Sequence, residues 1–430
     1  MLRAGTFETD ITPRLGTHLI GGFGPRVSTH VKDPLHAKAL VVDNGEAQVA
    51  LVTVDLCMIE RDEVDVAKRR IHERTGIPWE NVLVSATHTH TGPAAVSILA
   101  VDKDPDYAAL LPDRIADAVE NALGALQPAE MVYGRGEVDQ VFNRRWHMRD
   151  GSVVMNPGYQ NPDMVRPAGP VDRTLSVLGF RSPETAEPLG LYVNYPLHYV
   201  GSSPGDHISA DYFARVDHNL RRALGVPLAI LSNGTTGDVN NCDFTKPAPQ
   251  HRLPDGQAIK VAGIVAGAAM RAYYEGGICE DPSLRGALYE FPGIRDDVEA
   301  AQLAEDEQVV AQMDRMHPTA DQVRAFERLR LSRMPREQPT WVQALRVGPV
   351  VLVGLPGEIF VEIGLEIKQR SACPDTHCVE LANDWKAYIP TVKACHEGSY
   401  ETEVGTARRL VPETGPQMVE VALELVRQVW

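Results

Sequence analysis

The stretch AKALVVDNGEAQVALVTVD, residues 37–55, indicates the class of fold. Two runs rich in β-branched residues flank the turn sequence Asn-Gly-Glu-Ala, a pattern typical of a β-hairpin. Apolar residues at helical spacing then predict a helix over Glu63–Arg74, and a short apolar strand follows at Asn81–Ala86. Strand, turn, strand, helix and strand therefore follow one another, which indicates the α/β class with mixed β-sheets and outer helices.

The same alternation continues to the end of the chain. Further strands are predicted at Thr174–Phe180, Gly190–Tyr195, Pro227–Leu231, Val342–Val347 and Pro349–Gly354. Further helices are predicted at Leu111–Leu126, Asp211–Leu224, Ala258–Tyr274, Glu358–Arg370 and Met418–Val429. The unit of residues 37–74 returns near residues 342–370, although the two sequences barely match. The charged stretch Glu299–Arg333 predicts a helical surface excursion near residues 295–335, and Met155–Pro170 predicts a long ordered loop. Since no flexible linker divides the chain, we predict one catalytic domain over residues 1–430.

Composition and charge exclude several classes of function. The chain has 430 residues, enough for a large core, and a net charge of -16, which disfavours nucleic acid and anionic membranes as partners. Its start, MLRAGTFETDITP, lacks the apolar segment of a secretory signal, and no apolar run is long enough to span a membrane. Six scattered cysteines without a CxxC pair are typical of reduced thiols. We therefore expect a cytoplasmic protein with a small-molecule substrate, and a homo-oligomer stays open.

The most informative motif is SATHTHTGP, residues 85–93, which follows the strand at Asn81–Ala86. Residues two apart in a strand face the same side, so His88 and His90 are expected to project together. Paired imidazoles at the end of a strand are a common beginning of a metal site. Two histidines that are hydrogen-bonded in a polar pocket remain the alternative.

Other strands also end in residues with chemical potential. His198 ends the run LYVNYPLH, and it is either a second metal ligand or a satisfied core histidine. The loop SNGTTGDVNN, residues 232–241, presents Asp238 and Asn240 to a substrate, or is simply a connection rich in turns. Glu358 in the sequence LPGE is either a metal ligand or a carboxylate at a helix N-terminus.

Together these segments resemble the neutral, non-lysosomal ceramidase family, specifically its N-terminal catalytic domain. The matching segments are Ala4-Gly5 with Asp10–Pro13, Ser85–Pro93, Asn143-Arg144, Gly237–Val239, Leu355–Glu358, and the tyrosine pair Tyr388 and Tyr400. The resemblance spans nearly the whole chain. One departure concerns the GDV loop, where Asn240-Asn241 replace a Ser-Pro pair, so a serine acyl-enzyme at this position is excluded. The chain also ends at Trp430 without the immunoglobulin-like domain expected of secreted members.

The resemblance implies a zinc-dependent hydrolase that cleaves an amide bond. It places one Zn²⁺ per chain on His88, His198, Glu358 and Tyr388. It further implies that His90, Arg144 and Tyr400 contact the scissile group or its oxyanion. The altered loop puts ceramide in doubt as the substrate, and the missing signal segment and immunoglobulin-like domain lead us to expect a small or polar substrate rather than ceramide. A lactone, ester or glycosidic bond is the alternative within the same scaffold, and a non-catalytic protein that binds a metal or ligand is the alternative outside enzymes.

Overall fold

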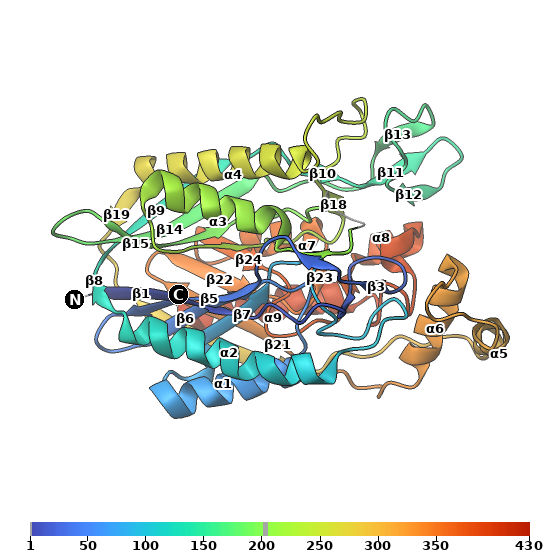
Figure 1. The fold of residues 1–430 in the computed structure, drawn as a ribbon, viewed down its shortest axis with the longest axis horizontal. Helices are drawn as coiled ribbons and strands as arrows, with labels where there is room; N and C mark the ends of the chain where they lie inside the picture. The colour runs from blue at the N-terminus through green and yellow to red at the C-terminus, as the bar shows by residue number, and fades with distance from the viewer. Residues whose placement is uncertain (1, 201–204) are drawn as a thin grey trace.

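The computed structural model describes residues 2–200 and 205–430. Two five-stranded sheets and one four-stranded sheet form its body, and helices cover their outer sides. Helices α3 (Asp211–Leu224) and α4 (Gly256–Glu275) lie along one side of the molecule, and α1 (Arg61–Thr75) and α2 (Pro105–Gly124) lie along the opposite side (Figure 1). The structure therefore confirms the predicted α/β class with mixed sheets and outer helices.

The first sheet contains the hairpin from which the fold class was predicted. Its strand order is β7-β6-β5-β1-β8, and the strands are β1 (Arg3–Asp10), β5 (His36–Asp43), β6 (Gln48–Val54), β7 (Val82–Ala86) and β8 (Gln127–Pro128). The pairs β1/β5 and β5/β6 are antiparallel, and the second pair confirms the hairpin. Helix α1 then carries the chain back over the sheet, so β7 runs parallel to β6.

This arrangement occurs three times along the chain, once more than the sequence suggested. The second sheet has the order β17-β15-β14-β9-β19, with β9 (Glu130–Glu137), β14 (Thr174–Arg181), β15 (Pro188–Asn194), β17 (Ala229–Ser232) and β19 (Gly277–Cys279). The third has the order β20-β21-β22-β24, with β20 (Leu284–Phe291), β21 (Thr340–Val347), β22 (Val350–Gly354) and β24 (Asp375–Val379). Helices α3 and α4 follow β15 and β17, and helices α7 (Val361–Arg370) and α9 (Thr414–Val429) follow β22 and β24. In each unit the strand that follows the first crossover helix (β7, β17 or β24) pairs parallel to the strand before that helix.

The three sheets meet at one central core because successive strand residues face opposite sides. In β5, Ala39 and Val41 pack beneath the helices α1 and α2, whereas Leu40 and Val42 point to the other side. There they join side chains from the second and third sheets, among them Phe180, Tyr192, Ile230, Leu345 and Leu352. Full burial of each such side chain contributes about 1.5–3 kcal/mol, so this shared core holds the three units together.

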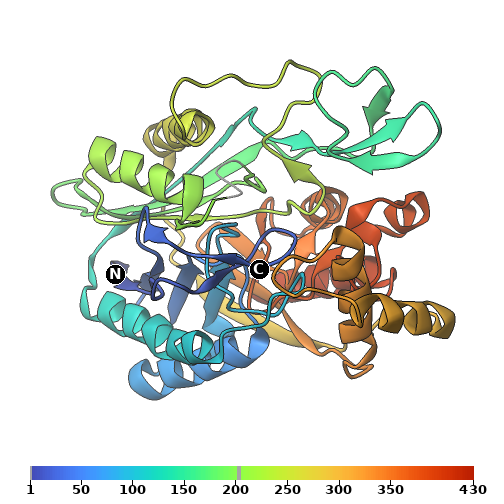
Figure 2. The ribbon, with the colours of Figure 1, turned by 45° about the vertical axis from the view of Figure 1, so that its right-hand side comes forward.

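Each unit carries an insertion between its first and second long strands. The first holds β2 (His18–Leu19), β3 (Arg26–Val27) and β4 (His30–Val31), and the second holds β10 (Phe142–Asn143), β11 (Arg145–Met148), β12 (Val153–Met155) and β13 (Met164–Pro167). The third holds α5 (Ala300–Val310) and α6 (Ala320–Ser332), which project at one end of the molecule (Figure 2). These two helices form the predicted excursion, and Arg315 and Arg330 tie it to Asp102.

Some predicted boundaries were wrong. Helix α2 begins at Pro105, earlier than expected, because the Asp104 side chain caps its first turn and proline fits there. Glu358 does not begin a helix: it lies in the short strand β23 (Glu358–Ile359), and α7 starts at Val361. The loop predicted over Met155–Pro170 contains β13, which pairs with β11.

Several shorter elements complete the chain. They are β16 (His207–Ile208), β18 (Val239–Asn240), β25 (Tyr388–Ile389), α8 (Val392–Glu397), and the 3₁₀ helices at Trp79–Asn81 and Tyr400–Thr402. Among the helices of residues 2–200 and 205–430, none combines the length and the apolar character needed to cross a bilayer.

Candidate metal centre

The predicted site residues lie where parallel strands of the three sheets end. His88 and His90 follow β7, His198 follows β15, and Glu358 follows β22. The carboxyl ends of neighbouring parallel strands open onto the same edge of a sheet, where binding sites commonly form. Here three such edges face one another, and His88, His198 and Glu358 offer ligand atoms that all lie within 4.8 Å of one another.

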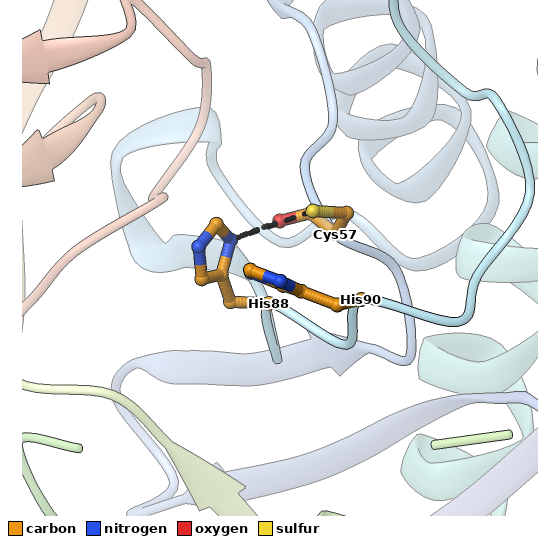
Figure 3. Close-up of side chains that lie close together, drawn as sticks. All are labelled: Cys57, His88 and His90. Atoms are coloured by element: carbon orange, nitrogen blue, oxygen red, sulfur yellow. Dashed lines mark hydrogen bonds between the residues drawn. The ribbon is translucent and has the colours of Figure 1, made fainter. Parts of the chain in front are cut away.

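A tight turn, not strand alternation, brings His88 and His90 together. Strand β7 ends at Ala86, and His88 has a φ of 70°, in the left-handed region that side chains seldom adopt. Such a conformation costs about 1–3 kcal/mol and persists only where its surroundings enforce it. The two rings then stand edge to face, with centroids 4.8 Å apart (Figure 3). The expectation that they would lie together is correct, but its physical reason was wrong.

Gly21 packs against this turn and leaves no space for a side chain. Its φ is 97°, and a Cβ atom at this position would lie 2.7 Å from Cα of His90. Glycine is therefore required here both by the positive φ and by the lack of space for a Cβ atom. The first insertion thereby fixes one side of the His90 backbone.

One nitrogen of His88 is held by the protein and the other is available. Nδ1 lies 2.9 Å from the carbonyl oxygen of Cys57 and therefore carries the proton of that hydrogen bond (Figure 3). Nε2 is buried without a hydrogen-bond partner among the described residues, and it lies 3.4 Å from Oε2 of Glu358. Burial lowers the pKa of His88, but Cys57 and Glu358 raise it by more, to well above its ordinary value. The space between His88 and Glu358 therefore attracts positive charge.

The Glu358 carboxylate is fixed from several directions. Its Oε1 accepts a hydrogen bond of 3.2 Å from the indole of Trp385, and the parallel pairing of β23 with β25 places Tyr388 opposite it. Burial raises the pKa of Glu358, but His88, Tyr388 and Arg144 together lower it to about 2. The group is therefore ionised at neutral pH although it is 2% exposed. No pattern in the sequence indicates this role of Trp385, because only the folded chain brings it to Glu358.

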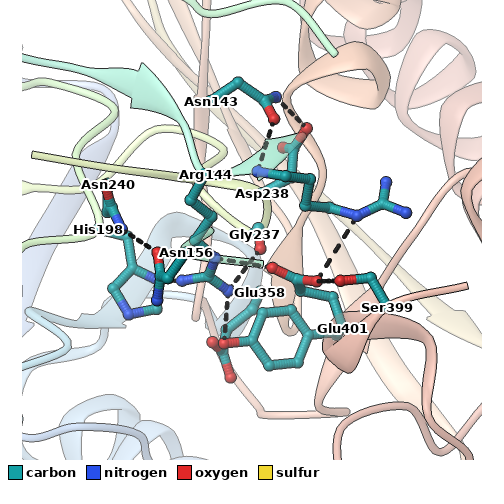
Figure 4. A network of polar contacts seen from close by, with 12 residues as sticks. Asn143, Arg144, Asn156, His198, Gly237, Asp238, Asn240, Glu358, Ser399 and Glu401 are labelled. Atoms are coloured by element: carbon teal, nitrogen blue, oxygen red, sulfur yellow. Dashed lines mark hydrogen bonds and ion pairs between the residues drawn. The ribbon is translucent and has the colours of Figure 1, made fainter. Parts of the chain in front are cut away.

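Arg144 connects most of the remaining site residues (Figure 4). Its Nε donates to Glu401 at 2.8 Å, and its Nη2 donates to the carbonyl of Gly237 at 2.9 Å and to the hydroxyl of Tyr388 at 3.0 Å. Its Nη1 donates to Nδ1 of His198 at 3.0 Å. Four of the five guanidinium N–H groups are therefore used inside the protein, which makes Arg144 a rigid part of the site.

His198 and His90 are in direct contact and are both neutral. Their Nε2 atoms lie 3.1 Å apart. Burial lowers the pKa of His198 well below its ordinary value, and the positive charge of His88 adds to this effect. Burial and His88 likewise lower the pKa of His90 to about 3. A neutral imidazole is the form that binds a metal ion or accepts a proton.

Two adjoining cavities follow from this arrangement. The smaller, of about 40 Å³, is lined by His88, Glu358, Cys57, Met58, Ile98, Trp385, Thr406 and Ala407 together with five residues that also line the larger one. The larger, of about 440 Å³, is lined by Gly22, Phe23, Arg144, Met155, Asn156, His198 and Val200 together with the same five. The shared residues are Gly21, His90, Leu99, Tyr388 and Tyr400. The smaller cavity has room for an ion and about one water, and the larger is the size of a small-ligand site.

The two residues predicted to bind substrate lie behind the larger cavity and do not line it. Asp238 accepts a hydrogen bond from Asn143 at 2.8 Å (Figure 4). It also accepts one from the backbone N–H of Val361 at 2.9 Å, so both of its carboxylate oxygens are occupied. Asn240 donates to the side chain of Asn156, which does line the cavity. Direct contact of Asp238 and Asn240 with a substrate stays a prediction, and their visible role is to support the wall.

The residues present suit a divalent metal ion. For bonds of about 2.1 Å at a tetrahedral angle, a nitrogen and an oxygen ligand lie about 3.4 Å apart. This equals the 3.4 Å between Nε2 of His88 and Oε2 of Glu358. Nδ1 of His88 is held by a carbonyl, which is the usual support of a metal-binding imidazole. Histidine and carboxylate side chains beside an open cavity thus make this a candidate site for a metal ion.

Comparison with known proteins shows which family the first half of the chain resembles. Residues 3–214 match the sequence model of the neutral/alkaline non-lysosomal ceramidase N-terminal domain. The neutral ceramidase of Pseudomonas aeruginosa is 28% identical over 183 residues, which cover 40% of this chain and 26% of that protein. Neutral ceramidase A of Dictyostelium discoideum is 32% identical over 146 residues, which cover 31% of this chain and 20% of that protein. Residues 3–214 are therefore similar to the N-terminal domain of the neutral/alkaline non-lysosomal ceramidases.

The similarity in fold extends over the whole chain. The crystal structure of the Pseudomonas aeruginosa neutral ceramidase superposes with a TM-score of 0.75 at 18% identity, covering 99% of this chain and 74% of that one. The sequence matches to the two curated relatives, by contrast, span only 26% and 20% of those proteins. The resemblance deduced from the motifs is therefore confirmed for family and fold.

Proposed function

We propose that the protein is a metal-dependent hydrolase that cleaves an amide bond, with one Zn²⁺ held by His88, His198, Glu358 and Tyr388. The observation that carries this proposal concerns Nε2 of buried His88, which has no hydrogen-bond partner among the described residues and lies 3.4 Å from Glu358 at a small cavity. A larger cavity adjoins it, so a substrate has access to the same place. The names of the curated relatives support the amide as the bond that is cleaved.

The bound ion supplies a Lewis acid that lowers the pKa of water to about 7 and polarises the substrate carbonyl. Two neutral imidazoles and one carboxylate leave it a net positive charge. The Tyr388 hydroxyl is the weakest ligand of the four, because burial raises its pKa well above the ordinary value even though Arg144 at 3.0 Å acts in the opposite direction.

Arg144 has a second role in this proposal that depends on the proton of His198. In the present arrangement Nδ1 of His198 accepts from Arg144, so the ring proton sits on Nε2, facing His90. When Nε2 serves as a ligand, the proton must sit on Nδ1, and Arg144 loses this acceptor. Nη1 then has both N–H groups available for the oxyanion that develops on the substrate carbonyl. Tyr400, which lines both cavities, donates to the same oxyanion.

His90 is the residue placed to move the proton. Its pKa of about 3 keeps it neutral at neutral pH, and it lines both the ion cavity and the substrate cavity. It can therefore accept a proton from the attacking water and deliver it to the leaving amine. These two transfers balance, because the amine leaves with the proton that water gave up.

The substrate class we propose is an N-acyl amide, ceramide included. The expectation of a substrate other than ceramide finds no support in the comparisons, since the relatives are named neutral ceramidases. A glycosidic bond is disfavoured because its hydrolysis usually needs two carboxyl groups, and among the described residues Glu358 alone supplies one to the two cavities. An ester or lactone passes through the same tetrahedral intermediate as an amide, so only a substrate assay separates them.

The test begins with metal content, measured by plasma mass spectrometry on protein purified without chelator or added zinc. We expect close to one zinc per chain and its loss in His88→Ala. We further expect His198→Ala and Glu358→Ala to abolish turnover of N-acyl amides while circular dichroism shows an intact fold. His377→Ala is the matched control, because His377 is equally buried but is hydrogen-bonded to Tyr133 away from the site. Metal-free protein that added zinc does not activate, or full activity in both ligand variants, would refute the proposal.

A further inference from the structure

Beyond this function, we propose that Cys57, His88 and His90 form a second ligand set that is selective for thiophilic metal ions and excludes the ion held by His88 and Glu358. The three side chains offer ligand atoms within 4.8 Å of one another, and Figure 3 shows them grouped on one side of the His88 ring. All three line the smaller cavity. The inference concerns ion binding alone and does not rest on catalysis.

The spacing of the sulfur and nitrogen atoms suits a metal ion. Sγ of Cys57 lies 3.7 Å from Nδ1 of His88. For a metal–sulfur bond of about 2.3 Å and a metal–nitrogen bond of about 2.1 Å at a tetrahedral angle, these atoms lie about 3.6 Å apart. The distance is too long for a strong hydrogen bond between the thiol and the ring, whose Nδ1 is already committed to the carbonyl of Cys57. An ion between them would replace the hydrogen bond from Nδ1 to this carbonyl.

The ligand type decides which ion this set prefers. A thiolate is a soft ligand and favours Cu⁺, Cd²⁺ and similar ions over hard cations, whereas imidazole and carboxylate suit zinc. The set around Glu358 contains a carboxylate and no sulfur, and the set around Cys57 contains sulfur and no carboxylate. The set with Cys57 therefore prefers soft ions and the set with Glu358 prefers zinc, although both sets use His88.

Sharing His88 makes the two sets mutually exclusive. An ion on Nδ1 of His88 requires the ring proton to move to Nε2, where it faces Oε2 of Glu358 at 3.4 Å. Nε2 then donates a hydrogen bond to Glu358, and it can no longer bind an ion together with that carboxylate. When the thiophilic ion binds, Cys57 gives its thiol proton to water, and the sulfur–metal bond takes its place. A soft ion would thus exclude the ion held by His88 and Glu358 by changing the tautomer of His88.

Cadmium is a suitable probe because thiolate bound to Cd²⁺ has an ultraviolet charge-transfer band. We expect titration of metal-depleted protein with Cd²⁺ to produce this band, saturating at one ion per chain. Cys57→Ser should lose it. Cys378→Ser should keep it, because Cys378 is equally buried but belongs to neither ligand group among the described residues. Glu358→Gln should also keep it, and prior loading with zinc should weaken cadmium binding competitively.

Three results would overturn the proposal. The band could persist in Cys57→Ser, X-ray absorption at the cadmium edge of the wild-type protein could show no sulfur neighbour, or zinc and cadmium could bind together on one chain. The absorption measurement needs no variant, so it decides the matter even where Cys57→Ser fails to fold. Absence of turnover in zinc-loaded protein would contradict the proposed function and leave the cadmium band unaffected.

Discussion

Replacement of Trp385 by phenylalanine should weaken metal binding without removing any ligand. The indole of Trp385 is 2% exposed and donates to Oε1 of Glu358 at 3.2 Å. The ring of phenylalanine fills most of the same space but has no N–H group. Oε2 keeps its position relative to His88 only as long as the carboxylate stays oriented. Trp385→Phe therefore tests how much the orientation of Glu358 contributes to metal binding, while all four proposed ligands are kept.

The expected size follows from the length and burial of this hydrogen bond. Loss of a partner that orients a metal ligand typically costs about 10–100-fold in affinity, which is about 1.4–2.8 kcal/mol. At 3.2 Å the bond is at the long end of the normal range. We therefore expect the lower part of that interval, about 10–30-fold. The measurement is the zinc dissociation constant, obtained by competition with a chromophoric chelator after metal depletion.

Trp341 offers a closely matched control. Its indole also donates to a carboxylate, that of Asp65 at 2.8 Å, and Arg61 covers its ring at 4.3 Å as Arg409 covers Trp385 at 4.2 Å. Trp341 lies in β21 and lines neither cavity. Trp341→Phe should leave zinc affinity unchanged. Equal affinities of both variants and the wild type, or an equal loss in both variants, would refute the reasoning.

Two further predictions concern the scaffold. Gly21→Ala should reduce turnover and lower the free energy of unfolding by about 1–3 kcal/mol, because its Cβ would lie 2.7 Å from Cα of His90 and its φ is 97°. Gly16→Ala, at a φ of 88° with nothing within 4 Å, measures the conformational cost alone, and equal effects in urea unfolding would contradict the steric argument. Burial lowers the pKa of Lys68 to about 7, whereas an unfolded lysine titrates near 10.4. The fold therefore binds fewer protons between these values, and its stability should rise by about 2 kcal/mol from pH 7 to pH 9. Lys68→Met should flatten this rise in urea unfolding at the two pH values, and an unchanged rise would show that Lys68 is not its cause.

The sequence predicted those parts of the fold that are set by local patterns. The hairpin β5–β6 has its own turn signal, and helix α3 was predicted with the bounds that the structure has, since its apolar face is regular. Strand β9 was missed because two glycines interrupt it. One of them, Gly134, is needed where α4 crosses: a Cβ there would lie 1.8 Å from the carbonyl oxygen of Ala272. Such a demand comes from packing and leaves no periodic signal in the sequence.

In the candidate site, too, residues with a local sequence signal were predicted and residues placed by tertiary contacts were not. The motif of His88 and His90 was visible because both residues lie on one short segment. Tyr388 has no such signal, and only the pairing of β23 with β25 brings it opposite Glu358. Cys57 was counted merely as one of six scattered cysteines, although the end of β6 places it beside His88. Residues that act through their neighbours in space were inferred from family resemblance or not at all.

The two cavities explain why the proposed roles fall on particular side chains. Only residues that line both can reach the ion and the substrate at once, and among these His90, Tyr388 and Tyr400 have polar side chains. His88 and Glu358 line the smaller cavity alone, and among the described residues Arg144 and His198 line only the larger. Holding the ion therefore falls mainly to the inner residues, and stabilising charge on the substrate falls to the outer ones. Transfer of a proton between water and the leaving amine requires a group at the boundary, and His90 is the neutral base that stands there.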